Sequence, residues 1–246
     1  MRWLVRFLFK AVIGFIGLSL LLVLLFRFVP VPVTATMLMD GNGITKDWTS
    51  LSNIDRNMVR AAIAAEDGKF CNHDGFDREA IEKAIEDNAR GGRIRGGSTI
   101  SQQTAKNVFL WQGGGYVRKG FEAWFTVLIE QIWGKRRIME VYLNVAETGL
   151  GTYGMEAGAQ RYFGKSAASL TPLEAARMAA ALPQPKQRAV RNPSGWLARH
   201  GSGEGEQLRL LLGVGLLGGF TTFSSFSLDV ISLIERGAAD AGRPTI

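Results

Sequence analysis

The sequence predicts a mainly α-helical protein with an N-terminal transmembrane helix and a C-terminal hydrophobic helical fragment. Three observations predict this fold class. Residues 11–26 form an uncharged apolar run, residues 45–200 carry apolar side chains mostly at helical spacing, and residues 210–228 form a second uncharged run. A chain of 246 residues is long enough for one large domain or two small ones. We therefore divide it into residues 1–34, 35–200 and 201–246.

The composition excludes some kinds of site but leaves the partner class open. Lys and Arg number 29 against 22 Asp and Glu, so the net charge is +7. Such a charge suits a polyanion, an anionic membrane surface or a phosphate-bearing substrate, without choosing among them. Cys71 is the single cysteine, so no intrachain disulfide can form. With two histidines in the chain, His73 and His200, a histidine-rich metal site is not expected.

The N-terminal run has the features of a membrane anchor. Flanking apolar residues extend it to roughly 20 residues, which is enough to cross a bilayer. Arg2, Arg6 and Lys10 precede the run and Arg27 follows it, so the positive-inside rule keeps the N-terminus in the cytoplasm. A cleaved signal peptide is the alternative. However, the run is followed by FRFVPVPV and not by a small-x-small cleavage site.

The first helix predicted after this anchor covers residues 55–67 and ends in two acidic residues. Its apolar side chains lie on one face, and Gly68 is a natural stop. Glu66 and Asp67 therefore sit in the last turn, where the backbone carbonyls repel negative charge and favour Lys or Arg. A residue that violates a local rule in this way marks a candidate functional site. The alternative is an exposed helix end.

A basic, glycine-rich loop at residues 90–97 precedes a helix with a polar stripe. Ser98 is a suitable N-cap for this helix, and Ser98, Gln102 and Lys106 recur every four residues on one face. Free N–H groups, a hydroxyl, an amide and an ammonium group on one face could cradle a phosphate. The loop is not a Walker A motif, because no Gly-Lys-Ser/Thr follows the glycines. The alternative is a solvated polar face.

Glycines 113–115 precede a predicted amphipathic helix. We expect its apolar stripe to pack in a core and not to bind a ligand; the stripe comprises Phe121, Trp124, Phe125, Leu128, Ile129 and Ile132. Arg118 and Glu122 are four residues apart and could form an ion pair on the helix surface. Arg before Glu is the weaker orientation, so such a pair would contribute less than about 0.5 kcal/mol.

The last part of this region predicts three helices and a glycine-rich loop. Residues 134–144 predict a helix, and a glycine-rich loop from residue 147 is followed by a short helix. Thr171, Pro172 and Glu174 form a full capping box at the start of another helix, which Pro183 ends. The role of this last helix is interpreted as structural.

Four blocks of sequence resemble, in order, the motifs of the peptidoglycan glycosyltransferases, in particular the monofunctional biosynthetic transglycosylases. The blocks are EDGKFCNHDGFD, GGSTISQQTAKNVFL, RKGFEA and KRRIMEVYLNVAETGLGTYGMEAGAQRYFGK, and the similarity covers roughly residues 35–200. It implies a lysozyme-like helical domain on the periplasmic face of the bacterial inner membrane. It also implies polymerisation of lipid II into β-1,4 glycan strands, with release of undecaprenyl diphosphate. The implied partners are lipid II, the growing glycan strand, membrane lipids and cell-wall synthesis proteins, with no nucleic acid.

The same resemblance assigns roles to residues. The reaction inverts the anomeric centre, so it needs a base for the acceptor hydroxyl and stabilisation of the leaving diphosphate. Glu66 matches the base, and the helix dipole should hold its pKa above that of a free Glu. Glu122 matches a second carboxylate on the diphosphate side, acting directly or through a divalent metal such as Mg²⁺. The positions that match donor contacts are Ser98, Gln102, Lys106, Arg118 and Lys119.

The C-terminal tail resembles a different family. Residues 207–237, which contain the sequence GLLGGFTTFSSFSLDV, are similar to the third membrane helix of the small fluoride exporters. That helix is broken, and the resemblance implies a vestigial sodium site at the backbone carbonyls of Gly218 and Thr221. The match covers only one of the four helices of such a channel. We interpret the tail as a fragment that arose by fusion, recombination or an assembly artefact, with a second span possible at residues 210–228.

Three alternatives to the transferase follow from these observations. A lysozyme-like enzyme could cleave the glycan, but a hydrolase needs no phosphate cradle. A fluoride channel is supported by the tail alone. An inactive membrane scaffold is disfavoured because both carboxylates, Glu66 and Glu122, are present.

Overall fold

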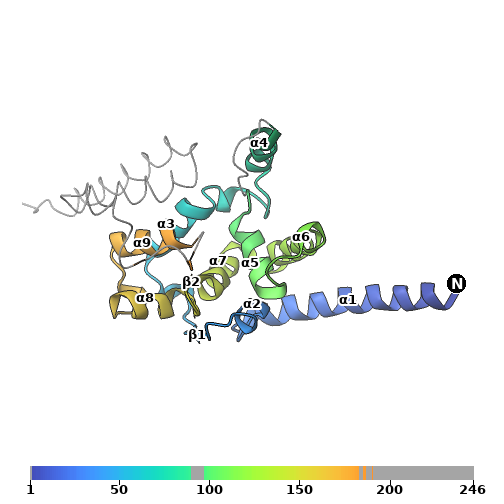
Figure 1. Cartoon of the computed structure of the whole chain (residues 1–246), viewed down its shortest axis with the longest axis horizontal. Coiled ribbons are helices and arrows are strands. Elements are labelled where there is room, and N and C mark those ends of the chain that lie inside the picture. Colours follow the sequence, from blue (N-terminus) through green and yellow to red (C-terminus); the bar gives the residue numbers. More distant parts are fainter. Residues whose placement is uncertain (1, 90–96, 183–184, 187–189, 191–246) are drawn as a thin grey trace, which may run out of the picture. The chain divides into compact units, whose positions relative to one another are not determined.

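The computed structural model describes residues 2–89, 97–182, 185–186 and 190 (Figure 1). The contacts between residues divide the chain into two compact units. Unit 1 comprises Met1–Gly41 and Lys69–Val145, and unit 2 comprises Asn42–Gly68 and Ala146–Ile246. Most of the predicted basic loop, Pro183 and the whole fluoride-exporter-like tail, with Gly218, Thr221 and the possible span 210–228, lie outside the described residues.

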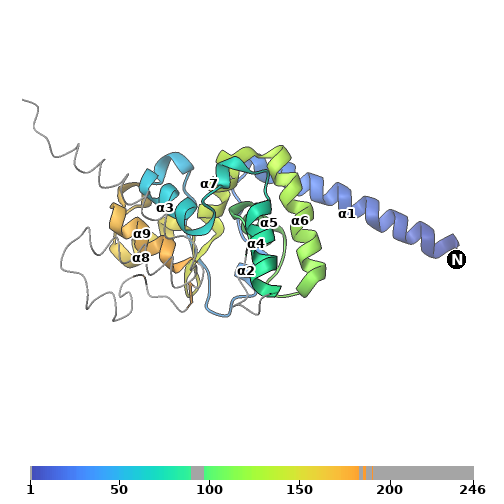
Figure 2. The ribbon, with the colours of Figure 1, turned by 90° about the horizontal axis from the view of Figure 1, so that it is seen from above.

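Unit 1 is helical where the structure describes it, which confirms the predicted mainly α fold class. Its elements are α1 (Arg2–Phe28), α2 (Ala35–Leu38), η2 (Phe70–Asn72), α4 (Arg78–Ala89), α5 (Ile100–Phe109), α6 (Gly115–Ile132) and α7 (Gly134–Val145). α5 packs against both α6 and α7, and α1 packs against α6 (Figure 2). Fully buried apolar side chains form the centre of this unit, among them Ile100, Ile129, Ile138 and Leu143.

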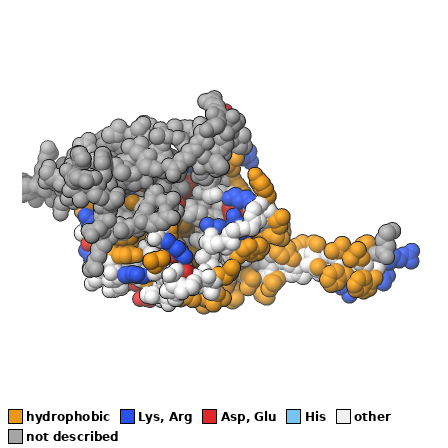
Figure 3. Space-filling model, in the orientation of Figure 1, with side chains coloured by type: hydrophobic (Ala, Val, Ile, Leu, Met, Phe, Trp, Pro, Cys, Tyr) orange, Lys and Arg blue, Asp and Glu red, His pale blue; other side chains and the backbone are white. Residues whose placement is uncertain are grey.

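α1 is long and apolar enough to cross a membrane, by length and composition, as the sequence predicts. Figure 3 shows apolar side chains over its visible surface and basic ones at its N-terminal tip. Ser19 and Val23 are the residues of α1 that are fully buried. The hydroxyl of Ser19 donates to the carbonyl oxygen of Phe15 at 2.7 Å, so this polar group is satisfied within the helix. α1 therefore fits a single-pass membrane anchor.

Unit 2 contains a small sheet that the sequence does not predict. β1 (Thr45–Lys46) pairs in parallel with β3 (Thr152–Tyr153), which pairs antiparallel with β2 (Glu147–Gly149). The strands have two or three residues each, too short for an alternating pattern to appear in the sequence. Gly151 makes the turn between β2 and β3 at φ +62°, and a Cβ there would meet the carbonyl oxygen of Asn42 at 2.5 Å. The predicted glycine-rich loop is thus a tight hairpin.

The helices of unit 2 are α3 (Arg56–Glu66), α8 (Met155–Phe163) and α9 (Pro172–Ala181), with one-turn helices η1 (Leu51–Asn53) and η3 (Ala167–Ser169). α3 packs against α9. The predicted capping box of α9 is confirmed. The Glu174 carboxylate accepts the N–H of Thr171 at 2.8 Å, and the Thr171 hydroxyl accepts the N–H of Glu174 at 3.4 Å.

Candidate active site

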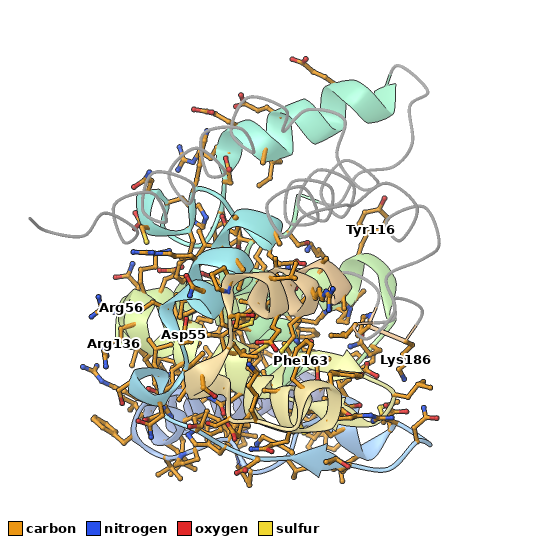
Figure 4. The ribbon with its side chains drawn as sticks, turned by 90° about the vertical axis from the view of Figure 1, so that its left-hand side faces the viewer. Asp55, Arg56, Tyr116, Arg136, Phe163 and Lys186 are labelled. Carbon is orange, nitrogen blue, oxygen red and sulfur yellow. The ribbon has the colours of Figure 1, made fainter. Side chains whose placement is uncertain are left out.

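Glu66 is the last residue of α3, in the position that the sequence predicts. The helix begins after Asp55 (Figure 4), whose carboxylate accepts the N–H of Asn57 at 2.7 Å. It ends at Asp67, the C-cap, whose N–H donates to the carbonyl oxygen of Ile63 at 2.9 Å. Oε1 of Glu66 is buried from solvent. Glu66 thus lies at the negative end of the α3 dipole, the geometry that would strengthen a base, and its raised pKa stays a prediction.

The start of α5 corrects the predicted N-cap. Thr99, not Ser98, caps this helix: its hydroxyl accepts the N–H of Gln102 at 3.2 Å, and Oε1 of Gln102 accepts the N–H of Thr99 at 3.0 Å. The T-x-x-Q spacing of a capping box is present in the sequence and could have identified this cap. The hydroxyl of Thr99 also donates a hydrogen bond to the carbonyl oxygen of Gly75 at 2.7 Å.

This cap changes the predicted phosphate cradle. The Gln102 side chain is only 5% exposed and forms part of the helix start, so its Oε1 belongs to the cap. Lys106 is half-buried further along α5. Ser98 lies just outside the helix and accepts a hydrogen bond from Nζ of Lys119 at 3.0 Å. Among the three predicted stripe residues, Ser98 thus contacts a cation of α6.

Glu122 forms the centre of a buried ionic cluster on α6. Its exposed fraction is 2%. Oε2 accepts a hydrogen bond from Nη1 of Arg118 at 2.6 Å, and Oε1 accepts one from Nζ of Lys119. The two cations precede Glu122 by four and three residues, which places all three on one helix face. The expected surface pair is therefore a buried cluster of two cations and one carboxylate, with a net charge of +1.

The glycine triplet before α6 shapes this cluster. Gly113, Gly114 and Gly115 have φ values of +82°, +89° and +58°, which residues with a Cβ rarely adopt. The turn brings the carbonyl oxygen of Gly113 to Nε of Arg118, which donates to it. Arg118 is thereby held from both ends of its guanidinium group. The cluster can present the partly exposed Arg118 and Lys119, together with Ser98, to an anion.

Glu122 does not fit a metal ligand in this arrangement. Each of its oxygens already accepts a hydrogen bond from a cation, and those cations would repel a divalent ion. Within the described ranges, no three His, Cys, Asp or Glu residues are grouped in a way that could hold a metal. We derive no step through Mg²⁺, and its involvement stays a prediction.

A second buried carboxylate, Glu130, was not identified from the sequence. It accepts hydrogen bonds from the hydroxyl of Ser101 and from Nζ of Lys135, the latter at 2.7 Å. The same Lys135 ammonium lies 4.7 Å from the ring centroid of Phe70. Glu130 therefore links α5, α6 and α7 to the segment that follows Glu66 in the sequence. An acidic residue in an otherwise apolar helical stretch was the available signal.

Comparisons with known proteins match this chain to two family models. The family model described as "Transglycosylase" matches residues 34–202, and that described as "CrcB-like protein, Camphor Resistance (CrcB)" matches residues 178–243. A biosynthetic peptidoglycan transglycosylase of Caulobacter vibrioides is 58% identical over 180 residues, covering 72% of this chain and 79% of the relative.

Two further relatives carry the same name. The protein of Xanthomonas axonopodis pv. citri is 48% identical over 222 residues, covering 86% of this chain and 90% of its own. That of Bdellovibrio bacteriovorus is 48% identical over 221 residues, covering 85% and 86%. The second family match confirms the resemblance of the C-terminus to a fluoride exporter. With the first match covering more than half of its residues, this chain belongs to the transglycosylase family.

Proposed function

We propose that this chain is a membrane-anchored peptidoglycan glycosyltransferase that polymerises lipid II into β-1,4 glycan strands and releases undecaprenyl diphosphate. The ionic cluster of Arg118, Lys119 and Glu122 carries this proposal, because it offers two anchored cations to an anionic leaving group. The names of the relatives, all biosynthetic peptidoglycan transglycosylases, support the same substrate class.

In the proposed reaction, the carboxylate of Glu66 takes the proton from the 4-hydroxyl of the acceptor sugar. The acceptor oxygen forms a bond to the anomeric carbon of the donor from the face opposite the diphosphate. The bond between that carbon and the diphosphate oxygen breaks, and the electron pair leaves with the diphosphate. Arg118 and Lys119 would neutralise the charge that develops there, with Ser98 as a further polar contact. An α-linked donor thus gives a β-linked product.

The cluster favours transfer over hydrolysis of a glycan. A lysozyme-like hydrolase breaks a bond to a sugar hydroxyl, so its leaving group is not a phosphate anion. A buried carboxylate that holds two cations would have no evident partner in that reaction. Product analysis separates the two functions, because a transferase lengthens chains and a hydrolase yields fragments.

The proposed location is the outer face of the bacterial inner membrane. α1 fits the anchor, and Arg2, Arg6 and Lys10 on its N-terminal side favour a cytoplasmic N-terminus. The proposed partners are lipid II, the growing strand, membrane lipids and other cell-wall synthesis proteins. Gln102 and Lys106 remain proposed donor contacts, to be tested as single alanine variants beside Ser98.

The test is a lipid II polymerisation assay on the detergent-solubilised full chain, with Glu66→Gln beside the wild type. Loss of a general base is expected to lower the rate by about 10²- to 10⁴-fold. Glu82→Gln, an exposed acid on α4, serves as the control for charge and should retain the wild-type rate. Polymer formation by Glu66→Gln at the wild-type rate would refute the role of Glu66. Fragments in place of polymer would refute the transferase.

A further inference from the structure

The start of α5 is attached to α6 by two side-chain hydrogen bonds, one of which belongs to the ionic cluster. In that bond, Nζ of Lys119 donates to the hydroxyl of Ser98 at 3.0 Å. In the other, the hydroxyl of Ser101, in the first turn of α5, donates to Oε1 of Glu130 near the end of α6. Eleven positions separate Lys119 from Glu130, which is about 16 Å along the helix axis. The two attachment points are therefore far apart on α6.

The attachment at Glu130 is the more rigid of the two. Ser101 is fully buried, and 5% of the Glu130 side chain is exposed. Nζ of Lys135 also donates to Oε1 of Glu130 at 2.7 Å, which compensates the buried charge. In contrast, 42% of the Lys119 side chain is exposed, and a long side chain in water holds its partner weakly. The position of the start of α5 on α6 therefore depends mainly on Glu130.

Glu130 also supports the loop that contacts the cap of α5. The Thr99 hydroxyl donates to the carbonyl oxygen of Gly75 at 2.7 Å. Gly75 lies against α6, where a Cβ on it would be 3.0 Å from Cγ of Glu130. The ammonium group of Lys135, which Glu130 holds, lies over the ring of Phe70 in the same loop. Glu130 thus supports the start of α5 both directly and through this loop.

The energetic cost of Glu130 favours a geometric role over a stabilising one. A buried carboxylate paired with an ammonium group adds little net stability, because desolvation of both charges offsets their attraction. Apolar side chains could join α5 to α6 without that cost. A hydrogen bond differs from an apolar contact because it restricts both the distance and the angle between its atoms. The bond from Ser101 to Glu130 therefore fixes where α5 begins, and Ser98 lies three residues before Ser101.

We propose that Glu130 is a positioning residue for the leaving diphosphate. Through Ser101 it holds the start of α5 against α6, so that the hydroxyl of Ser98 and the ammonium group of Lys119 meet the same anion. Glu130 itself touches no substrate. Without its carboxylate, the start of α5 moves relative to α6, and Ser98 no longer lies where the diphosphate leaves. This inference rests on the proposed function, but its first readout needs no catalysis.

The first test follows the start of α5 by amide hydrogen exchange, measured by mass spectrometry on the full chain in detergent. In Glu130→Gln and in Ser101→Ala, the N–H groups of Gln102 and Gln103, which bond within the cap of α5, should exchange about tenfold faster than in the wild type. Ser101→Ala removes one hydroxyl and leaves Glu130 paired with Lys135, so it guards against a variant that fails to fold. Unchanged exchange in both variants would overturn the inference.

The second test determines whether Glu130 acts through Ser98. Ser98→Ala and Glu130→Gln should each polymerise lipid II about tenfold more slowly than the wild type, the first by losing a contact to the anion and the second by misplacing it. The double variant should also be about tenfold slower, because the position of Ser98 no longer matters once its hydroxyl is gone. Independent effects would multiply to about 100-fold, which would mean that Glu130 only supports folding and would refute its positioning role.

Glu156→Gln is the matched control for this pair of variants. Glu156 is also a buried carboxylate, but it accepts hydrogen bonds from Ser166 and Ala167 in unit 2. Any loss that it causes should multiply with the loss of Ser98→Ala. A wild type that makes no polymer would refute the proposed function and the role of Glu130 within it. An active wild type in which the losses of Ser98→Ala and Glu130→Gln multiply would refute this inference alone.

Discussion

At the scale of single residues, Arg118 and Lys119 stabilise the charge on Glu122, and the Glu122 carboxylate in turn holds these two cations in position. A carboxylate that is 2% exposed keeps its charge only when partners compensate for lost hydration, and Arg118 and Lys119 do so here. Removing the charge leaves the two cations close together without a counter-ion. Glu122 is thus positioned to act through Arg118 and Lys119, whatever its own contact with substrate.

Glu122→Gln tests this role with little change in side-chain volume. Polymerisation should fall by about 10²-fold, because the cations lose the geometry that neutralises the leaving diphosphate. The measurement is the rate at saturating lipid II with and without Mg²⁺. Glu79→Gln is the control, since Glu79 is an exposed residue of α4 that pairs with the exposed Lys69. A variant that keeps its rate without Mg²⁺ and loses only the stimulation by Mg²⁺ would instead identify Glu122 as a metal ligand.

Gly75 shows how one glycine constrains the segment after Glu66. Its φ is +88°, and a Cβ there would lie 2.7 Å from Cγ2 of Thr126 and 3.0 Å from Cγ of Glu130. Gly75→Ala should therefore destabilise the protein by about 2 to 4 kcal/mol, through backbone strain and overpacking together. Thermal unfolding in detergent measures it. Gly120→Ala is the control, because an added Cβ there meets nothing within 4 Å and should be neutral or stabilising. Equal stability of the two variants would contradict the close approach.

Sequence reasoning finds residues whose chemistry conflicts with their local position and misses those whose role depends on distant partners. Glu66 was identifiable because an acid at a helix C-terminus is unfavourable, and α3 does end there. The partners of Glu130 come from α5 and α7, so no local pattern reveals their contact. Ser98 and Thr99 are both good caps, and the reciprocal bond with Gln102 decided between them.

At the scale of elements, the capping box of α9 depends on the charge of Glu174. Burial alone would raise the pKa of Glu174, but hydrogen bonds from Lys165 and Thr171 outweigh it and hold the pKa below its ordinary value of 4.5. The stabilisation is therefore fully present above about pH 4.5 and is lost as the pH falls through the folded-state pKa. α9 packs on α3, the helix that carries Glu66. The cap at the start of α9 therefore also supports the packing of α3.

Glu174→Gln should lower the free energy of unfolding by about 0.5 to 1 kcal/mol at pH 7, and the difference from the wild type should shrink toward pH 3. Unfolding curves at several pH values provide the measurement. Glu82→Gln, on the exposed side of α4, should show no such pH-dependent difference. A deficit for Glu174→Gln that is constant with pH would mean that its carboxylate charge does not contribute.

Long helices were predictable and short elements were not. α3, α6, α7 and α9 each show apolar residues at helical spacing over two or more turns, whereas α2 and the three strands have two to four residues. The sequence predicts the apolar stripe of α6, but it does not predict which helix packs against that stripe. Phe121, Trp124 and Phe125 have the pattern of a core helix, and the helix that covers them is the membrane anchor.

At the scale of the whole molecule, contacts group residues that the sequence separates. Unit 1 begins with the anchor, is interrupted after Gly41 and resumes at Lys69. The proline-rich stretch after α1 has the composition of a linker, which would separate the anchor from the rest of the chain. However, Phe15, Val23 and Phe26 contact residues about a hundred positions later, so the anchor packs with those helices. Such grouping is set by packing between distant segments, which composition and periodicity do not encode.

The C-terminal tail gives the last prediction. The transglycosylase match ends at residue 202, and the described contacts of both units lie at or before residue 190. A chain of residues 1–202 should therefore polymerise lipid II within about twofold of the full chain, because tolerance to truncation follows the burial and bonding of the affected segment. Parallel assays in detergent measure it, with Glu66→Gln in both lengths as the inactive control. A truncated chain that loses activity would show that the tail supports the enzyme, and one that gains activity would show that the tail inhibits it.

A second test of the tail measures fluoride efflux from liposomes that contain the full chain in their membrane. The efflux should match that of liposomes without protein, because the tail resembles one helix of a channel that needs pairs of four-helix subunits. Measurable efflux above that level would give the tail a function of its own.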